Sequence, residues 1–219
     1  MEKEFPKPKL LLVEGGDDAR FLSEMLRILK LKKDDFQIEQ YGGKQGLPRF
    51  LAPLPDIGSF KRNVKSLGIV RDADEQGTDS ALQSVCASLH NAGLSESENE
   101  IIPTRSALKI TAYIMSASTG KGRLEEMLLE SVADNWRILC VDDYWKCLAK
   151  QCPDDDRLPK DESKARLAVF LASHRSLALQ TGFESESDDT FRLDHAVQRH
   201  YLDLNHQNIR SVSDFLLNL

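Results

Sequence analysis

Three carboxylates follow two short apolar runs of the sequence. Glu14 comes directly after the run Leu10–Val13, and Asp72 and Asp74 come shortly after the run Leu67–Val70. Neither run has a helical period, which is typical of strands buried on both faces of a parallel sheet. Ligands bind open α/β sheets at the carboxyl ends of the strands. The pattern therefore places these acids where chemistry would occur.

Carboxylates gathered at one edge of a sheet repel each other unless a cation lies between them. A divalent metal ion is the expected cation. Oxygen ligands, without Cys or His at suitable spacing, favour Mg²⁺ or Mn²⁺ over zinc. A purely structural interpretation also fits these residues: Glu14 would cap the following helix, and Asp72 and Asp74 would be loop acids at a strand end.

The same residues resemble the motifs of a known domain. A strand ending in Glu14-Gly15 with Asp18 four residues after the Glu, followed by a second strand ending in Asp72-Ala73-Asp74, is similar to the Toprim domain. That domain occurs in topoisomerases, bacterial primases, recombination-mediator proteins and OLD-family nucleases. The runs GIVRDADEQG and IMSASTGKGRLEEMLLE resemble small stand-alone Toprim-like proteins related to the OLD-family nucleases. The resemblance covers about the first 135 residues well and the remainder loosely.

The resemblance implies a Rossmann-like sheet and Mg²⁺-dependent cutting or joining of phosphodiester bonds. Asp72 and Asp74 would hold the metal, with Glu14 as a further ligand or as the base for the attacking water. Asp18 would be a second metal ligand or an acid just outside the ligand set, although its position also suits a helix cap.

Glu125 matches the Leu-Glu with which a helix begins in this family. Glu125 and Glu126 are adjacent, so on a helix they point about 100° apart and only one readily faces the crevice. We choose Glu125. Where relatives usually carry an Asp-Asn pair, this sequence has Ser118-Thr119, a departure that weakens a role for those two side chains.

Glycines and lysines near these acids are candidates for contacts with phosphate. Backbone N–H groups of glycine-rich turns can approach an anion, and we include Gly15, Gly16, Gly43 and Lys44 in this group. The turn at Gly43 and Lys44 is equally an ordinary connection from a strand to a helix. Lys164, at the start of an amphipathic helix, would neutralise charge in the transition state, or it is a surface lysine.

The composition limits the possible partners. The chain has 219 residues and a net charge of −6, which argues against broad, non-specific attraction to nucleic acid. A nuclease still fits, because bound metal ions supply positive charge locally, and small phosphate esters fit as well. The four cysteines show no C-x-x-C spacing. No apolar stretch approaches the ~20 residues of a membrane span, and the N-terminus lacks an apolar signal core, so we expect a cytoplasmic protein.

The order of strands and helices predicts an α/β fold. Residues 1–135 are expected to form a Rossmann-like Toprim domain with a mainly parallel four-stranded sheet, and residues 136–219 a helical C-terminal extension packed on it. The expected strands are Leu10–Val13, Phe36–Tyr41, Ser66–Val70 and Ile110–Met115. The expected C-terminal helices are Val141–Cys152, Ser163–His174, Ala196–Leu202 and Val212–Leu217, with Phe183–Asp189 as a mobile segment.

Three functions are compatible with the sequence. The first is a Mg²⁺- or Mn²⁺-dependent nuclease acting on DNA or RNA. The second is a Toprim-like module that binds metal or nucleic acid, turns nothing over and acts through a separate ATPase, since the sequence contains no G-x-x-x-x-G-K-[ST] motif. The third is hydrolysis of a small phosphate ester by the same acids.

Overall fold

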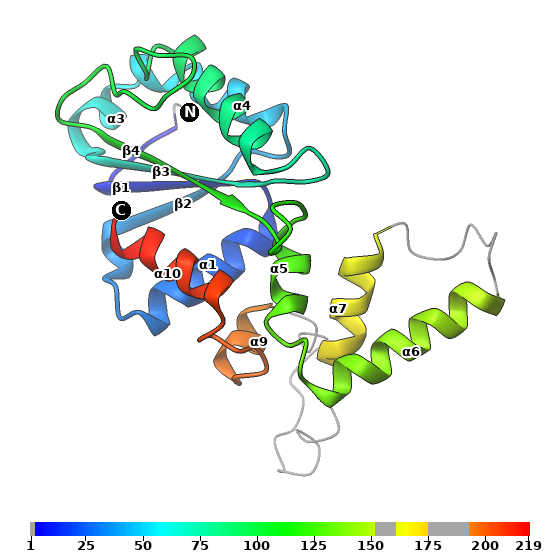
Figure 1. Cartoon of the computed structure of the whole chain (residues 1–219). Coiled ribbons are helices and arrows are strands. Elements are labelled where there is room, and N and C mark those ends of the chain that lie inside the picture. Colours follow the sequence, from blue (N-terminus) through cyan, green and yellow to red (C-terminus); the bar gives the residue numbers. More distant parts are fainter. Residues whose placement is uncertain (1–2, 152–160, 175–192) are drawn as a thin grey trace.

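A four-stranded sheet with helices on both faces forms the body of the computed structural model (Figure 1). The structure describes residues 3–151, 161–174 and 193–219, so Cys152 and Phe183–Asp189 lie outside the described residues. The strands are β1 (Lys9–Val13), β2 (Phe36–Gln40), β3 (Ser66–Asp72) and β4 (Lys109–Met115). Their order is β2-β1-β3-β4, and all pairings are parallel. The predicted fold class is confirmed.

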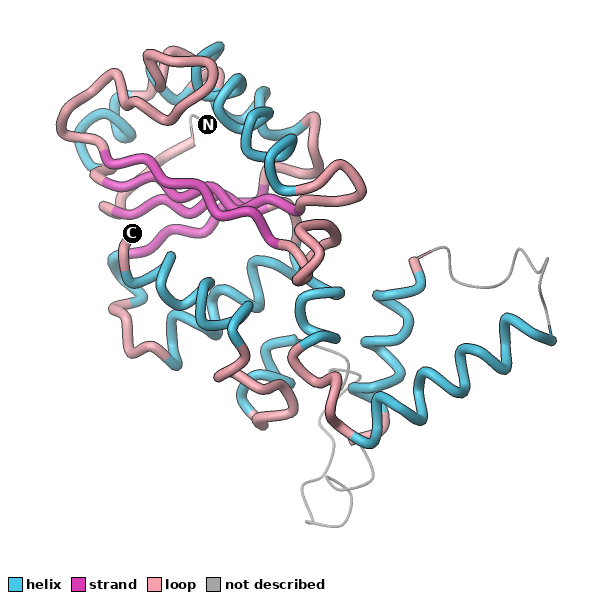
Figure 2. Tube along the Cα trace, in the orientation of Figure 1, coloured by secondary structure: helices cyan, strands magenta, loops and turns pink. Residues whose placement is uncertain are grey.

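Helices lie on both sides of the sheet (Figure 2). The alternation of side chains along β1 accordingly divides the core into two layers. Leu10 and Leu12 pack in one hydrophobic cluster, and Leu11 and Val13 pack in the other. Successive residues of a strand point to opposite faces, so the run of four apolar residues reflects burial on both faces. The first layer contains α2 (Gly46–Leu51), α3 (Gly58–Asn63) and α4 (Thr78–Asn91); the second contains α1 (Gly16–Ile28) and α10 (Gln207–Leu217).

Three connections leave the carboxyl edge of the sheet close to the predicted acids. The helix α1 begins at Gly16, three residues after β1 ends, and α5 (Leu124–Glu130) follows β4 through the loop 116–123. The loop 73–77 joins β3 to α4. Because β1 and β3 are neighbours in the sheet, Glu14 and Asp72 follow adjacent strand ends.

Helices complete the chain after α5, as predicted, but their bounds differ from the expected ones. The helix α6 (Trp136–Gln151) begins earlier because the side chain of Asn135 accepts the backbone N–H of Arg137 at 3.0 Å. Likewise α10 begins at Gln207, where His206 accepts the N–H of Asn208 at 3.4 Å. The bounds of the other two helices are α7 (Glu162–Ala172) and α9 (Leu193–Gln198).

Two prolines separate the helical turns that follow β2. The helix α2 ends at Leu51, and a short 3-10 helix, Leu54–Asp56, follows it. Proline lacks a backbone N–H and ends helices, and Pro53 and Pro55 lie at this break. A second 3-10 helix, Lys33–Asp35, precedes β2.

The C-terminal helices are not equivalent in their packing. Figure 1 shows α6 and α7 projecting from the body as a hairpin, whereas α10 lies under the sheet and α9 beside α1. Ile209, Val212 and Leu216 of α10 share a hydrophobic cluster with Leu11 and Val13 of β1. The division at residues 135 and 136 stays a prediction. Among the described helices, none has both the length and the apolarity needed to cross a bilayer.

Candidate functional site

Five predicted acids come together at the carboxyl edge of the sheet. Glu14 follows β1, Asp72 ends β3, Asp74 lies two residues further, and Asp18 and Glu125 stand in the first turns of α1 and α5. Each of the other four acids raises the pKa of Asp72 through its charge. The two strand ends and the two helix starts therefore form one acidic cluster.

The pKa of Asp72 is raised further than that of Asp18. Burial, followed by the charges of the other acids, raises the pKa of Asp72 to about 8. The backbone N–H of Leu124 donates to its Oδ1 at 3.3 Å. Burial and like charge both disfavour the ionised form, so a cation bound here would relieve both effects.

Asp18 is both a helix cap and a member of the cluster. Its Oδ2 accepts the backbone N–H of Gly15 at 2.8 Å, as the third helical residue of a capping box does. Its side chain is largely buried, and burial raises its pKa to about 6. The charges of Glu125 and Glu14 add to this rise. The two interpretations of Asp18 are therefore compatible.

Glu14 carries a buried oxygen that lacks a partner. Its Oε2 accepts no hydrogen bond from the described residues. Burial first, and then the charge of Asp74, raises the pKa of Glu14, whereas the charges of Arg71 and Lys44 lower it. Such an orphaned acceptor is costly, by roughly 1–3 kcal/mol. A cation or a proton donor at this point would satisfy it.

Asp74 is held by two cations. Lys44 Nζ lies 2.8 Å from its Oδ2, and Arg123 Nε donates to its Oδ1 at 3.1 Å. Its backbone has a positive φ of 51°, a conformation that L-residues other than Asn and Asp adopt rarely. Two backbone hydrogen bonds with Gly122, of 2.8 and 3.0 Å, fix this turn against the loop before α5.

Glu125 faces the cluster, and Glu126 does not. Glu125 is buried, and burial raises its pKa while the charge of Lys164 lowers it. Lys164 Nζ lies 3.9 Å from Glu125 and 2.8 Å from Asp17. Glu126 instead accepts the backbone N–H of Arg123 at 2.9 Å and caps α5. Lys164 thus lies next to one acid of the cluster, Glu125, and its role in neutralising charge stays a prediction.

Two of the three glycine candidates for phosphate binding, Gly15 and Gly43, use their amides inside the protein. The N–H of Gly15 donates to Asp18, and those of Gly42 and Gly43 point to the carbonyl oxygen of Glu14 at 3.1 and 3.5 Å. Gly16 is the first residue of α1. Lys44 is paired with Asp74. A phosphate contact through Gly15 or Gly43 would need these hydrogen bonds to open, and the role of all four residues stays a prediction.

Sequence reasoning missed Arg123 and Asp161. The guanidinium of Arg123 bridges Asp74 and Asp161, with an NH1 to Oδ2 distance of 2.9 Å to the latter. Asp161 caps α7 by accepting the N–H of Lys164 at 3.0 Å. No motif marks these residues. Two weak signals in the sequence could have indicated them. Arg123 is a basic residue directly before the Leu-Glu at the start of α5, and Asp161 is an acid three residues before Lys164.

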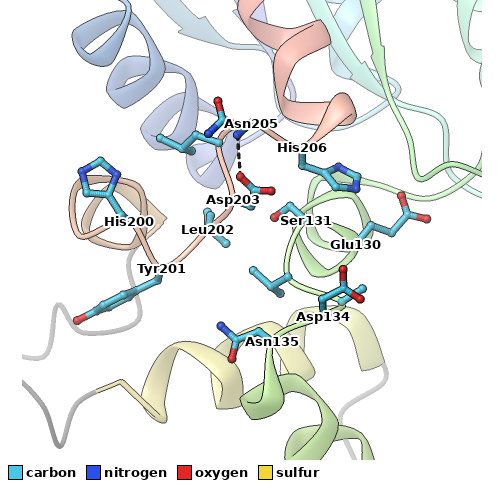
Figure 3. Close-up of a pocket in the computed structure, with 13 residues that line it drawn as sticks. Glu130, Ser131, Asp134, Asn135, His200, Tyr201, Leu202, Asp203, Asn205 and His206 are labelled. Atoms are coloured by element: carbon cyan, nitrogen blue, oxygen red, sulfur yellow. Dashed lines mark hydrogen bonds between the residues drawn. The ribbon is translucent and has the colours of Figure 1, made fainter.

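A separate pocket lies at the C-terminal end of α5, away from the acids at its start (Figure 3). It has a volume of about 590 Å³ and is lined by 130–135 and 200–206, so it contains none of the predicted site residues. Its polar groups are partly satisfied within the protein. Glu130 accepts from Ser118 and Asn208, and Asp203 accepts the N–H of Asn205 at 2.9 Å. The pocket therefore does not compete with the acidic cluster as the candidate site.

The acidic cluster suits a divalent cation in its chemistry, but only partly in its geometry. Within residues 3–151, 161–174 and 193–219, no group of three or more His, Cys, Asp or Glu side chains is arranged to hold a metal ion. The carboxylate of Asp74 is turned to Lys44 and Arg123, and that of Asp18 to Gly15. Glu14 Oε2 and Asp72 remain as oxygen donors of the type that Mg²⁺ and Mn²⁺ prefer.

Comparisons with known proteins give one family and two distant structural similarities. The model of the family DUF3226, described as a protein of unknown function, matches residues 8–219. No curated protein matches the chain.

Both structural similarities are to the C-terminal region of the OLD protein of Xanthomonas campestris pv. campestris. The structure phased with mercury has a TM-score of 0.43 and 14% identity, and covers 98% of this chain and 96% of that chain. The structure phased with iodine has a TM-score of 0.38 and 16% identity, with the same coverage of 98% and 96%. At TM-scores this low, we base no functional conclusion on either similarity.

Proposed function

We propose that this chain, which belongs to the DUF3226 family, is a Toprim-type phosphodiesterase that uses Mg²⁺ or Mn²⁺ to cleave DNA or RNA. One observation carries the proposal: buried and partly buried acids from two strand ends and two helix starts converge on Asp72, beside an orphaned oxygen of Glu14. A purely structural role for these acids leaves Glu14 Oε2 without a hydrogen-bond partner and leaves the charge of Asp72 next to four other acids.

Each residue of the cluster has a role in this proposal. Asp72 and Asp74 would hold the first divalent ion, with Glu14 as a further ligand or as the base for the attacking water, and Asp18 and Glu125 would complete a second site. When bound, such ions supply positive charge that stabilises the entering and leaving oxygens of an in-line displacement. For Asp74 to serve as a ligand, its carboxylate must first leave Lys44 and Arg123.

Two side chains of the cluster are suited to handling protons and charge. Burial raises the pKa of Glu14, which brings a carboxylate closer to the range in which it accepts a proton at neutral pH. Glu14 is thus the candidate base for the attacking water. Lys164, 3.9 Å from Glu125, would neutralise charge that develops on the phosphate.

The second candidate is a Toprim-like module that binds a metal ion or nucleic acid without turnover, in the cytoplasm, with a separate ATPase as its partner. The ion pairs of Asp74 favour this alternative, because both oxygens of this carboxylate already contact a cation of the protein. Hydrolysis of a small phosphate ester would use the same residues, and the net charge of −6 suits a small substrate.

A combined assay of metal binding and cleavage tests the proposal. Purified protein is incubated with supercoiled plasmid, single-stranded RNA and bis(p-nitrophenyl) phosphate, each with Mg²⁺, Mn²⁺ or EDTA. We expect metal-dependent nicking that Asp72→Asn and Glu14→Gln abolish and that the exposed control Glu98→Gln retains. An ion at 100 times its dissociation constant adds roughly 2.7 kcal/mol of stability, which corresponds to roughly 5–10 °C in melting temperature. We expect that gain for the wild type and little gain for Asp72→Asn.

The outcomes separate the three functions. A melting gain with Mn²⁺ but no cleavage of any substrate would make the non-catalytic module the correct interpretation. Cleavage of the small ester alone would replace the nuclease by a phosphate-ester hydrolase. If wild type and Asp72→Asn respond equally to Mn²⁺, Asp72 is not a principal ligand.

A further inference from the structure

Two cations occupy both carboxylate oxygens of Asp74. Lys44 comes from the loop after β2 and lies 2.8 Å from Oδ2, and Arg123 comes from the start of α5 and lies 3.1 Å from Oδ1. The side chain of Asp74 is 17% exposed, whereas those of Lys44 and Arg123 are 45% and 47% exposed. The carboxylate is thus fixed in the site, and the two cations reach it from solvent on separate elements.

A divalent ion on Asp74 and these two ion pairs exclude each other. The same oxygens cannot coordinate a metal and keep both contacts, and a metal ion repels an ammonium and a guanidinium group a few ångströms away. Because the cation of each pair is about half exposed, each pair contributes little stability. Exchange of the two cations for one divalent ion is therefore inexpensive.

The released cations would remain at the mouth of the site. Arg123 keeps a second contact with Asp161, 2.9 Å from NH1, which tethers the guanidinium when Nε leaves Asp74. Lys44 follows Gly42 and Gly43, which both have a φ of 76° and whose N–H groups are directed at the carbonyl oxygen of Glu14. The start of the Lys44 side chain is thus held beside the acids. Guanidinium and ammonium groups are the donors that proteins use for phosphate oxygens.

We infer that Lys44 and Arg123 form a phosphate-binding pair that Asp74 holds until a divalent ion takes that carboxylate. The inference deepens the proposed function and rests on it: it assigns the substrate phosphate to these two residues and places metal binding before phosphate binding. By linkage, the ion and the phosphate each increase the affinity for the other. The chain has a net charge of −6, so its surface as a whole does not attract phosphate groups. Local cations such as Lys44 and Arg123 would supply that attraction at the site.

Isothermal titration calorimetry of the full chain tests the exchange. Mn²⁺ is titrated into the wild type, Lys44→Met, Arg123→Met and the control Lys121→Met, which removes an exposed charge two residues from Arg123 without breaking a described ion pair. We expect Lys44→Met and Arg123→Met to bind Mn²⁺ about two- to fivefold more tightly, the effect of losing a competing exposed ion pair. The control should keep the wild-type affinity.

A second titration measures the affinity of the protein for inorganic phosphate. Inorganic phosphate is titrated with and without saturating Mg²⁺. We expect wild type and Lys121→Met to bind phosphate only in the presence of Mg²⁺. We expect Lys44→Met and Arg123→Met to lose about tenfold in phosphate affinity, because each removes a charge-assisted hydrogen bond. Arg123→Lys, which keeps the charge, should recover part of the loss.

The results distinguish this inference from the proposed nuclease. Two results would contradict the inference that Lys44 and Arg123 are a phosphate-binding pair held by Asp74, even if the protein cleaves nucleic acid. One is unchanged or weaker Mn²⁺ binding in Lys44→Met and Arg123→Met. The other is phosphate binding in these variants equal to that of the control. The absence of any Mn²⁺ binding to the wild type would overturn it as well. Tighter Mn²⁺ binding together with lost phosphate binding, in a protein that cleaves no nucleic acid, would support the pair and contradict the nuclease.

Discussion

Burial and the charges of neighbouring acids both raise the pKa of Asp72. Burial is the larger cause, and the charges of four neighbouring acids add to it, so that the pKa reaches about 8. The sequence predicted this gathering because apolar strands end at acids, and adjacent parallel strands end at one edge. The cations around Asp74 were not predictable in the same way, because their contacts depend on the path of two loops.

The first prediction concerns stability and pH in EDTA. The folded-state pKa of Asp72 is raised from 3.8 to about 8, so the folded protein binds this proton more tightly than the unfolded chain does. The contribution of protonated Asp72 to the free energy of unfolding is therefore fully present below about pH 4 and is lost as the pH rises toward 8. The free energy of unfolding falls by at most about 1.4 kcal/mol per pH unit in this range. Asp72→Asn should remove the loss between pH 6 and 8 and should melt no lower than wild type at pH 8.

Urea unfolding at pH 5, 6, 7 and 8 measures this effect. The remaining acids with raised pKa values, Asp18, Glu14 and Glu125, should leave a smaller slope of the same sign in the variant. The exposed control Glu98→Gln should follow the wild type. A variant that is less stable than wild type at pH 8 would show that Asp72 is a structural acid, for example through its hydrogen bond with Leu124.

Among the secondary-structure elements, the strands were easier to predict than the helix starts. Strands β1, β2, β3 and β4 lie within two residues of their expected bounds at each end, because burial and the flanking turns define them. Two C-terminal helices begin five residues before their expected starts, where Asn135 and His206 provide caps in polar sequence. Apolar periodicity does not report such caps.

The turn between β2 and α2 provides a second prediction. A Cβ on Gly46 would lie 1.8 Å from the backbone carbonyl oxygen of Tyr41, a clash that only a backbone shift can relieve. Gly46→Ala should therefore destabilise the fold by about 1–3 kcal/mol or more. Since the same turn carries Gly42 and Gly43 against Glu14, the shift should also disturb the acidic cluster.

Gly16→Ala is the matched control, because Gly16 also begins a helix. A Cβ at Gly16 would approach only the guanidinium of Arg20, at 3.7 Å. Its replacement should be neutral or stabilising by up to about 1 kcal/mol. Urea unfolding of both variants at one pH compares them. Equal effects of the two substitutions would show that the turn around Gly46 relaxes at little cost.

At the scale of the whole molecule, one hydrophobic cluster joins the two ends of the chain. Leu11 and Val13 of the central strand pack in it together with Ile209, Val212 and Leu216 of α10. A Cβ on Gly68 of β3 would lie only 2.9 Å from the side chain of Leu219, so the last residue approaches the sheet closely. By contrast, Trp136, Leu139 and Tyr144 on α6 are largely exposed. The C-terminal helices thus include one that covers the sheet and one that projects from it.

This packing predicts that residues 1–135 do not fold stably alone. Without α10, one face of the sheet would expose the apolar side chains of β1 and β3, and buried apolar surface contributes about 25 cal/mol per Å². We expect the fragment 1–135 to bind the dye ANS and to lack a cooperative thermal transition. The full chain should unfold in a single transition by circular dichroism and tryptophan fluorescence.

Two substitutions in the full chain test whether the packing of α10 stabilises the sheet. Ile209 is fully buried, so Ile209→Ala should cost about 2–5 kcal/mol and shift the whole transition, including the signal of the sheet. Leu139 is 57% exposed, so Leu139→Ala should change stability by less than about 0.5 kcal/mol.

If the fragment 1–135 instead unfolds cooperatively at the temperature of the full chain, the α/β body is independent of the C-terminal helices. The acidic cluster would then be assembled by residues 1–135 alone, and the contacts of Asp161 and Lys164 would be dispensable for the folding of the sheet.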